Sequence, residues 1–180
     1  RNSVNDNQYT SNIKNKKVTY TSGEDEILAT IEISTGEAIT KYWLVRDIYE
    51  LQNMQNNLTA NYMLAGDIDA QAIGFNPIGS GSIKEDGSLD TTGAYSGIFD
   101  GNGFTISNLT INRPDTDFVG LFGAKSGVVK NVGLQSSNII GKDYVGGIAG
   151  INAGETTACY NIGGTVTGNQ YVGGLAGANV

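Results

Sequence analysis

Several residue types on which enzyme sites depend are scarce or missing in this sequence. Histidine is absent from all 180 residues, which excludes the commonest general base, the HExxH zinc site and any Ser-His or Cys-His pair within this chain. The single cysteine, Cys159, excludes a disulfide within the chain. It fits either a reducing compartment or a bacterial surface protein that is stabilised by stacking. With only 2 prolines, the chain is neither collagen nor a Pro/Gly low-complexity segment.

Long apolar runs and excess positive charge are also missing. No run of about 18 apolar residues occurs, so the sequence predicts no insertion into a membrane. The chain has 11 basic and 18 acidic residues and a net charge of −7, which disfavours nucleic acid and anionic membranes as partners. Because the chain begins at Arg1 rather than Met, we expect it to be a piece of a longer protein, with further coils after Val180.

Glycine is abundant and recurs within repeated strings. The strings DYVGGIAG (143–150) and QYVGGLAG (170–177) are nearly identical, and DFVGLFG (117–123) is a shorter copy. When the strings are aligned on the aromatic residue, four units appear with spacings of 23, 26 and 27 residues. These units start at residues 95, 118, 144 and 171. Such a period is typical of a repeat architecture.

The pattern inside each unit predicts an all-β fold. Short segments with β-branched residues are separated by glycine, which is typical of strand and turn. Since similar segments recur in the same direction, they pair in parallel, and the result is a parallel β-helix with coils about 4.8 Å apart. Parallel crossovers are generally right-handed. We divide the chain into a flanking segment (1–45), partly disordered or forming extra strands, a capping helix and lead-in strand (46–74), and the solenoid (75–180).

Alignment of the units also predicts columns of like side chains. One column is a ladder of aromatic rings, and another fills the interior with aliphatic side chains. Asn108 lies over Asn131 in this alignment, which predicts an amide ladder at a tight bend. The aromatic ladder comprises Tyr95, Phe118, Tyr144 and Tyr171, and the interior column comprises Ile98, Leu121, Ile148 and Leu175.

One segment has helical rather than strand spacing. Ile48 and Leu51 lie three residues apart, and Asp47 and Glu50 form a D-x-x-E capping box. We therefore predict one short helix near 47–57. An open β-helix end exposes core side chains and strand edges, so this helix is expected to cover the first coil.

The strings YVGGIAG, YVGGLAG and VGLFG resemble the GLUG repeat, and the match extends over residues 46–180. The preceding strings GIFDGNGFTISNLTI, NYMLAGDIDA and GFNPIG resemble the lead-in of such repeats. The resemblance implies a pectin-lyase-like right-handed β-helix from a large bacterial surface or secreted protein. Examples are filamentous-haemagglutinin-type adhesins and the non-catalytic parts of IgA-specific metallopeptidases. Ala149 and Ala176 stand where the family has bulkier residues, and the first 45 residues resemble no known segment.

Two acidic pairs are candidate metal sites. Asp117 and Asp143 both precede the aromatic residue on neighbouring coils, so their carboxylates can bind Ca²⁺ or act as an acid and base pair, as in β-helix glycosidases. The favoured reading is that both are turn residues exposed to water. Asp67 and Asp69 share one face of an extended segment, where solvent exposure or turn capping is the favoured reading. The sequence indicates no other cofactor.

Two N-x-T sequons are candidate glycosylation sites in a secreted protein. They begin at Asn57 and Asn108, and a tight bend at Asn108 would hinder modification there. Tyr42 and Trp43 can form an exposed binding spot or pack against the helix, and packing is the favoured reading. Cys159 aligns with apolar residues, which indicates an inert core thiol.

These features predict a non-catalytic segment of a bacterial cell-surface or secreted protein, with a structural and adhesive role. Its partners would be the rest of a larger parent chain and a host surface protein or glycan. One alternative is a polysaccharide lyase or hydrolase on a β-helix, since fold does not decide function. That activity requires clustered charged side chains along a groove, whereas the lysines here are scattered. Another alternative is a spacer beside a peptidase domain.

Overall fold

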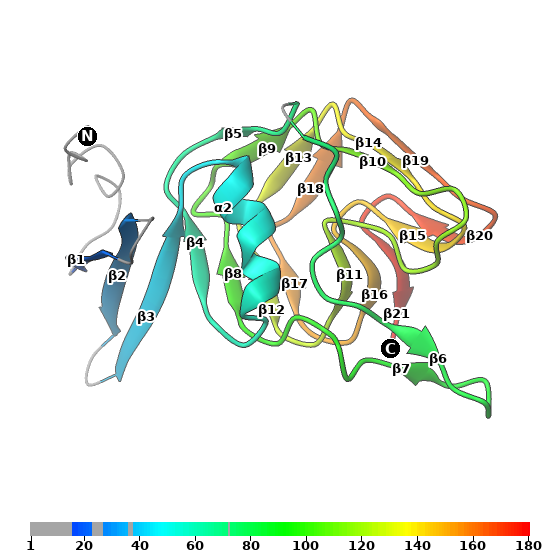
Figure 1. Ribbon diagram of the computed structural model, residues 1–180, viewed down its shortest axis with the longest axis horizontal. Helices are drawn as coiled ribbons and strands as arrows, with labels where there is room; N and C mark the ends of the chain where they lie inside the picture. The colour runs from blue at the N-terminus through cyan, green and yellow to red at the C-terminus, as the bar shows by residue number, and fades with distance from the viewer. Residues whose placement is uncertain (1–15, 23–26, 36–37, 72) are drawn as a thin grey trace.

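The computed structural model describes residues 16–22, 27–35, 38–71 and 73–180. These residues form a β-solenoid of about three turns, with one short helix among them near the N-terminal end of the solenoid (Figure 1). This confirms the prediction of an all-β parallel β-helix with a short helix. The disorder predicted for the start of the flanking segment falls mainly on residues 1–15, which lie outside the described residues.

One complete coil, residues 128–152, shows how the solenoid is built. Its strands are three or four residues long and are separated by bends, so that each strand belongs to a different face. The coil consists of β12 (Val128–Lys130), β13 (Gly133–Gln135), β14 (Asn138–Ile140), β15 (Asp143–Gly146) and β16 (Ala149–Asn152).

The coils before and after it repeat this order. The preceding coil contains β8 (Ile98–Asp100), β9 (Thr105–Ser107), β10 (Thr110–Asn112) and β11 (Phe122–Lys125). In that coil a bridge from Val119 to Val145 takes the place of the fourth strand. The following coil contains β17 (Thr156–Thr157), β18 (Tyr160–Ile162), β19 (Thr165–Thr167), β20 (Gln170–Gly173) and β21 (Ala176–Asn179).

Equivalent strands of successive coils pair in parallel. Val129 lies opposite Phe99 of the coil before and opposite Thr156 of the coil after. Because backbone groups bond to both neighbours, each inner coil satisfies its polar main chain through the stack. The parallel walls are β4-β8-β12-β17, β5-β9-β13-β18, β10-β14-β19, β15-β20 and β11-β16-β21.

An antiparallel sheet extends the first wall at its N-terminal side. It consists of β1 (Lys16–Ser22), β2 (Ile27–Thr35) and β3 (Ala38–Val45). The strand β3 then runs parallel to β4 (Tyr62–Leu64), and β5 (Ile68–Asp69) pairs with β9. Parallel stacking therefore begins before residue 75, the solenoid start proposed from the sequence. Part of the flanking segment is continuous with the solenoid.

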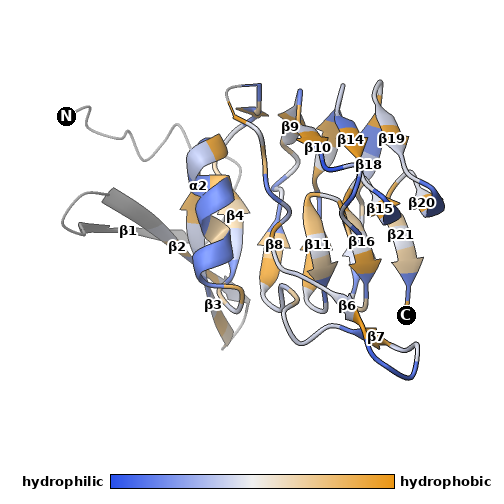
Figure 2. Cartoon of the chain, turned by 45° about the vertical axis from the view of Figure 1, so that its right-hand side comes forward, coloured by the Kyte–Doolittle hydropathy of each residue, from blue (hydrophilic) through white to orange (hydrophobic). Residues whose placement is uncertain are grey.

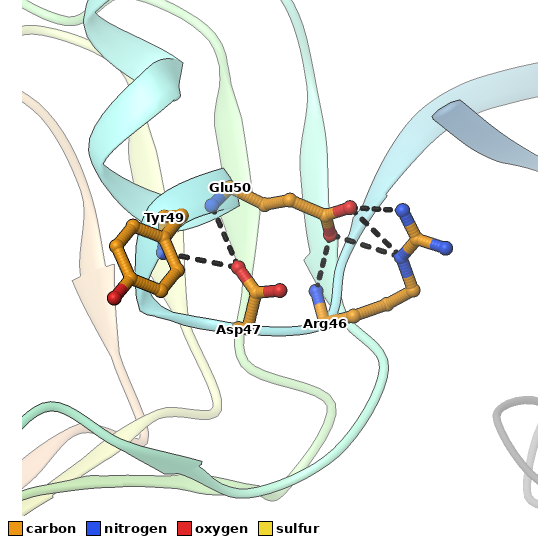
Figure 3. A network of polar contacts seen from close by, with 4 residues as sticks. All are labelled: Arg46, Asp47, Tyr49 and Glu50. Carbon is orange, nitrogen blue, oxygen red and sulfur yellow. Dashed lines mark hydrogen bonds and ion pairs between the residues drawn. The ribbon is translucent and has the colours of Figure 1, made fainter. Parts of the chain in front are cut away.

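A helical segment connects β3 to β4. The α-helix α2 (Ile48–Asn53) continues into a 3₁₀ turn, η1 (Met54–Asn56). Asp47 caps the helix, because its Oδ1 accepts hydrogen bonds from the backbone N–H groups of Tyr49 and Glu50 at 3.0 and 2.9 Å. The Glu50 carboxylate accepts from the backbone N–H of Arg46, at 2.7 Å, and also pairs with the Arg46 guanidinium (Figure 3). The capping box therefore reaches back one residue further than the sequence predicted.

The helix covers the N-terminal end of the core. Ile48, Leu51 and Met54 are buried and belong to the main hydrophobic cluster, together with Leu64 and Phe75. Figure 2 shows α2 at this end of the solenoid, with a hydrophilic side facing outward. Burial of one apolar stripe accounts for the stability of so short a helix, which would not form alone in water.

Residues 79–94 form a loop that extends from the solenoid and contains a small β-hairpin. Its strands are β6 (Ser82–Ile83) and β7 (Leu89–Asp90), and they project from one side of the molecule (Figure 1). Leu89 packs against an outer cluster that includes Ala94 and Phe118. The hairpin therefore shields apolar side chains on the outside of the coils.

Burial decreases toward the C-terminal end of the stack. Leu121 and Ile148 of the interior column are 0% and 1% exposed, whereas Leu175 of the same column is 36% exposed. Leu121 and Ile148 are covered by the coils on both sides, and Leu175 lies on the last coil. No helix in the described part of the chain is long and apolar enough to cross a membrane.

Candidate functional site

Three aromatic residues form a continuous stack along the outside of the solenoid. The rings of Phe118 and Tyr144 have centroids 4.9 Å apart, and those of Tyr144 and Tyr171 are 4.5 Å apart, with planes only 9° from parallel. All three residues have positive φ angles, of 62°, 58° and 54°. We call Phe118, Tyr144 and Tyr171 the aromatic stack. Its rings are progressively more exposed, from 8% at Phe118 to 56% at Tyr171.

Tyr95 does not belong to this stack, so the predicted ladder is wrong in its first member. Tyr95 stacks instead on Phe122 inside the core, with centroids 5.0 Å apart, and its hydroxyl donates to the Ala60 carbonyl at 3.0 Å. It lies opposite Lys125 of the next coil. Ile98 is likewise misplaced in the predicted interior column, because it lies opposite Val128.

The observed register shows that the first unit is also longer than the units that follow. Asp100 and Thr105 lie opposite Lys130 and Gly133, so the first unit has two more residues at this turn. A second pair of extra residues lies between 112 and 118, next to the turn at 141–143 of the following coil. Tyr95 lies opposite Lys125, 30 residues further along, so the aromatic spacing of 23 residues joined positions that are not stacked.

Asn108 and Asn131 lie at different bends and do not form the predicted amide ladder. Each has a positive φ, of 58° and 55°, so the prediction of a tight turn at both residues agrees with the structure. Their side-chain amides donate to carboxylates on the preceding coil, Asn108 to Asp69 at 3.0 Å and Asn131 to Asp100 at 3.1 Å. The hydrogen bond from Asn108 holds the pKa of Asp69 below its usual value.

An amide ladder does occur at a column that the sequence reasoning missed. The Asn152 side chain donates to Asn179 Oδ1 at 2.9 Å, 27 residues further along. Both residues end strands of the same wall, β16 and β21, where Lys125 ends β11. The repeat strings AGIN and AGAN contain the signal, since asparagine follows the conserved AG step at the same offset.

Asp117 and Asp143 make coil-to-coil hydrogen bonds. Asp117 Oδ1 accepts from the backbone N–H of Asp143 at 3.3 Å, and Asp143 Oδ1 accepts from that of Gln170 at 3.1 Å. Lys142 lies 3.6 Å from the Asp117 carboxylate. Within the described residues no group of three or more acidic or cysteine side chains is arranged to hold a metal ion. The geometry therefore gives both carboxylates a role in stacking.

The other acidic pair behaves similarly. Asp67 Oδ1 accepts from the backbone N–H of Thr105 at 2.8 Å, and Asp69 Oδ1 accepts from that of Gln71 at 3.1 Å as well as from Asn108. These bonds fix the first bend of the solenoid against the second coil. The sequon residue Asn57 is exposed, and its Oδ1 accepts from Thr59 Oγ1 at 3.0 Å, whereas Asn108 is partly buried at its bend.

A buried lysine, Lys125, was not singled out by the sequence. Its side chain is fully buried, and Nζ donates to the carbonyl oxygens of Glu155 at 2.8 Å and Gly127 at 3.2 Å. Burial lowers the pKa of Lys125 to about 8. Burial also raises the pKa of the neighbouring Cys159 thiol, which packs against the main core.

The capping region contains a cavity of about 230 Å³ between β3, the α2–η1 segment and β4. We call it the cap cavity. Leu44 and Val45 of β3 are among the residues that line it. Tyr42, by contrast, is buried on the outer face of β3, only 5% exposed. The other residues that line the cap cavity are Trp43, Glu50, Asn53, Asn56, Asn57 and Tyr62.

The polar groups around the cap cavity differ in how they are used. The Glu50 carboxylate is paired with Arg46, and the Tyr62 hydroxyl donates to the Asn57 carbonyl at 3.1 Å. The Lys41 ammonium lies 5.1 Å from the centroid of the Trp43 ring. Within the described residues, the Trp43 indole N–H and the side-chain amides of Asn53 and Asn56 make no hydrogen bond. Trp43 thus lines the cap cavity together with residues of the α2–η1 segment.

The sequence is similar to parts of much longer proteins. No family model matches the sequence, and no solved structure matches it. Halomucin of Haloquadratum walsbyi is 38% identical over 163 residues, which is 83% of this chain and 2% of halomucin. A protein described as a Gly-rich membrane protein of Evansella cellulosilytica is 32% identical over 125 residues, which is 62% of this chain and 13% of that protein. The chain therefore spans only a small fraction of the curated relatives that it matches.

Proposed function

We propose that this chain is a non-catalytic segment of a bacterial cell-surface or secreted protein, with a structural and adhesive role, and that its repeats are of the GLUG kind. The observation that carries the proposal is the repeated contact between coils. The aromatic stack, the Asn152–Asn179 pair and the two aspartate-to-backbone bonds each join a residue to its equivalent one coil further on. Contacts of this kind let a rod lengthen coil by coil.

The last coil supports a role within a longer rod. It carries exposed apolar side chains, and its strands β17 to β21 have a partner coil on one side only. Open strand edges and apolar surface favour pairing with a further strand layer. This face is therefore suited to pairing with a further layer of strands. The exposed residues are Tyr160, Ile162, Tyr171, Val172 and Leu175.

A surface location is supported by the relatives. One of them is described as a membrane protein, and both are much longer than this chain. An acidic, histidine-free solenoid without disulfides suits a protein that gains stability by stacking. The non-catalytic assignment is supported by the use of Asp117 and Asp143 in hydrogen bonds between coils, since a pair acting as acid and base would need free carboxyl oxygens facing a substrate groove.

The experiment is to coat beads with the purified chain and measure their retention on surfaces that carry host glycans or extracellular host proteins. Beads coated with an unfolded variant are the control, and retention should be lost with them. A parallel incubation with pectic and related polysaccharides measures the release of new sugar ends. Turnover above a buffer control would contradict the proposal and favour the lyase or hydrolase alternative. Equal retention of folded and unfolded chains would contradict the adhesive role.

A further inference from the structure

We propose that the cap cavity is a binding site for a neutral saccharide. The site lies at the N-terminal cap, away from the repeated columns, and it does not depend on the rod function proposed above. Its wall combines the aromatic side chains of Trp43 and Tyr62 with three asparagine side chains on the α2–η1 segment and just after it. Ligand pockets are commonly apolar with a few placed polar groups that set orientation and specificity.

The unused polar groups point to the chemistry of the ligand. Asn53 and Asn56 have side-chain amides without a hydrogen bond within the described part of the chain, and Asn57 uses its Oδ1 for Thr59, which leaves its amide N–H₂ available. A carboxamide offers donors and an acceptor together. Sugar hydroxyl groups also donate and accept, so several adjacent amides complement a polyhydroxylated ring better than they complement a hydrocarbon.

The charges around the cavity favour a neutral ligand. The negative charge of Glu50 is neutralised by the Arg46 guanidinium, and both side chains are largely buried (Figure 3). The Lys41 ammonium lies over the Trp43 ring rather than in the cavity wall. No uncompensated charge therefore lines the cavity among the described residues. A phosphate or carboxylate ligand would lose its hydration without gaining a charged partner.

The size of the cavity sets the size of the ligand. A cavity of about 230 Å³ corresponds to about eight water molecules at their share of liquid volume. This is below the range of about 300–1,000 Å³ that is typical of drug-sized ligands. One sugar ring fits this volume, with the Trp43 indole against its less polar face and the three amides at its hydroxyl groups. The indole N–H offers a further donor at the rim.

Trp43 provides the probe, because it is the only tryptophan in the sequence. The full chain is titrated with glucose, galactose, mannose and N-acetylglucosamine while tryptophan fluorescence is recorded, with glucuronate as the charged comparator. We expect a saturable change with at least one neutral sugar and weaker binding of glucuronate. Absence of a saturable change with all four neutral sugars, or tighter binding of glucuronate, would overturn the proposal.

Variants locate the binding. Asn53→Ala and Asn56→Ala should each weaken binding by about 3- to 10-fold, the usual effect of losing one hydrogen bond. Gln55→Ala is the matched control, since Gln55 is an exposed amide on the same η1 turn that does not line the cavity. Thermal melts verify that the three variants remain folded. Unchanged affinity in both asparagine variants, or an equal loss in the Gln55 variant, would place binding elsewhere and overturn the proposal.

Discussion

The side-chain amide of Asn131 donates a hydrogen bond to Asp100 Oδ1, 3.1 Å away on the preceding coil. Asp100 is 8% exposed and also accepts from the backbone N–H of Asn102 at 2.8 Å. Asn131 itself has a left-handed backbone with φ of 55°. One residue thus makes a tight bend and attaches that bend to the coil before it, which explains why asparagine suits this position.

Two replacements of Asn131 should separate the contribution of its left-handed backbone from that of its hydrogen bond to Asp100. We expect Asn131→Ala to lower the free energy of unfolding by about 2–3 kcal/mol, since it removes a hydrogen bond to a buried carboxylate and places a Cβ without compensation in the left-handed region. Asn131→Gly keeps the backbone freedom and should cost only about 1 kcal/mol. Urea unfolding followed by circular dichroism measures both.

The next coil provides the control for the backbone contribution. Ala158 occupies the equivalent bend with φ of 52°, and there the residue on the preceding coil, opposite Thr157, is Lys130 rather than an aspartate. Ala158→Gly should therefore raise the free energy of unfolding slightly, by about 0.5–1 kcal/mol. Equal losses in Asn131→Ala and Asn131→Gly would show that strain plays no part at this bend.

The aromatic stack predicts unequal costs for two similar substitutions. Tyr144 has a ring on each side, whereas Tyr171 has only one stacked neighbour. Since each pair is worth about 0.5–1.5 kcal/mol beyond burial, Tyr144→Ala should destabilise the chain about twice as much as Tyr171→Ala. The backbone angles of the two residues are nearly the same, 58° and 54°, so strain cancels in the comparison. Denaturant midpoints would contradict the stacking explanation if Tyr171→Ala were the costlier change.

The sequence predicted the parallel β-helix correctly but assigned several side chains to the wrong stacked columns. The recurrence of YVGG with aliphatic residues at a fixed offset reports stacking directly, because parallel coils place equivalent residues over one another. The first unit has extra residues at two turns, and a turn on the surface of a solenoid accepts insertions without disturbing the walls. Alignment on aromatic residues alone placed Tyr95, Ile98 and Asn108 in the wrong columns, because the string YSG at 95–97 is equivalent to KSG at 125–127 rather than to FVG at 118–120. The correct register between coils is shown by Phe99, Val129 and Thr156, which lie opposite one another in one wall.

The cap cavity and Lys125 could not be predicted for a different reason. Trp43 and Asn56 approach each other only because β3 and the α2–η1 segment fold against β4, and no repeat spacing reports such a contact. Lys125 lies in the string FGAKSG, where a lysine next to glycine and serine is typical of an exposed turn. Its burial depends on carbonyl oxygens contributed by neighbouring turns.

Gly127 and Gly154 occupy equivalent positions on successive coils, where the neighbouring coil leaves no room for a side chain. A Cβ placed on Gly127 would collide with the carbonyl oxygen of Gly97, and one placed on Gly154 would collide with that of Gly127. The obstacles are backbone atoms of the adjacent coil, so they cannot rotate away. Gly127→Ala should therefore force the coils apart and cost about 3 kcal/mol or more. Thermal unfolding measures the loss.

Gly174 is the matched control for this column. A Cβ at Gly174 would meet nothing within 4 Å, and Gly174 has no positive φ. Gly174→Ala should leave the melting temperature unchanged or raise it slightly, because alanine restricts the unfolded chain. If Gly127→Ala were tolerated as well as Gly174→Ala, close coil-to-coil approach would not explain the glycine column.

The burial of Lys125 predicts a stability that increases with pH in the mildly alkaline range. In the unfolded chain the lysine keeps its ordinary pKa of 10.5, whereas burial lowers its pKa to about 8 in the folded chain. Below about pH 8 both states are protonated, and the folded state holds a charge away from water. As the pH rises through 8, the folded state releases this proton while the unfolded state retains it. The unfolded state then binds more protons, so the free energy of unfolding rises.

Urea unfolding at several pH values between about 7 and 8.5 tests this prediction. The upper limit matters because burial raises the pKa of Cys159 from 9.0 and that of Tyr95 from 10.0 in the folded state, and both shifts reduce stability at higher pH. Lys125→Met keeps an unbranched apolar stem without a titratable group, so its stability should be flat over this range. A wild-type profile parallel to that of Lys125→Met would mean that the ammonium at Lys125 is solvated well enough by Gly127 and Glu155 to keep its ordinary pKa.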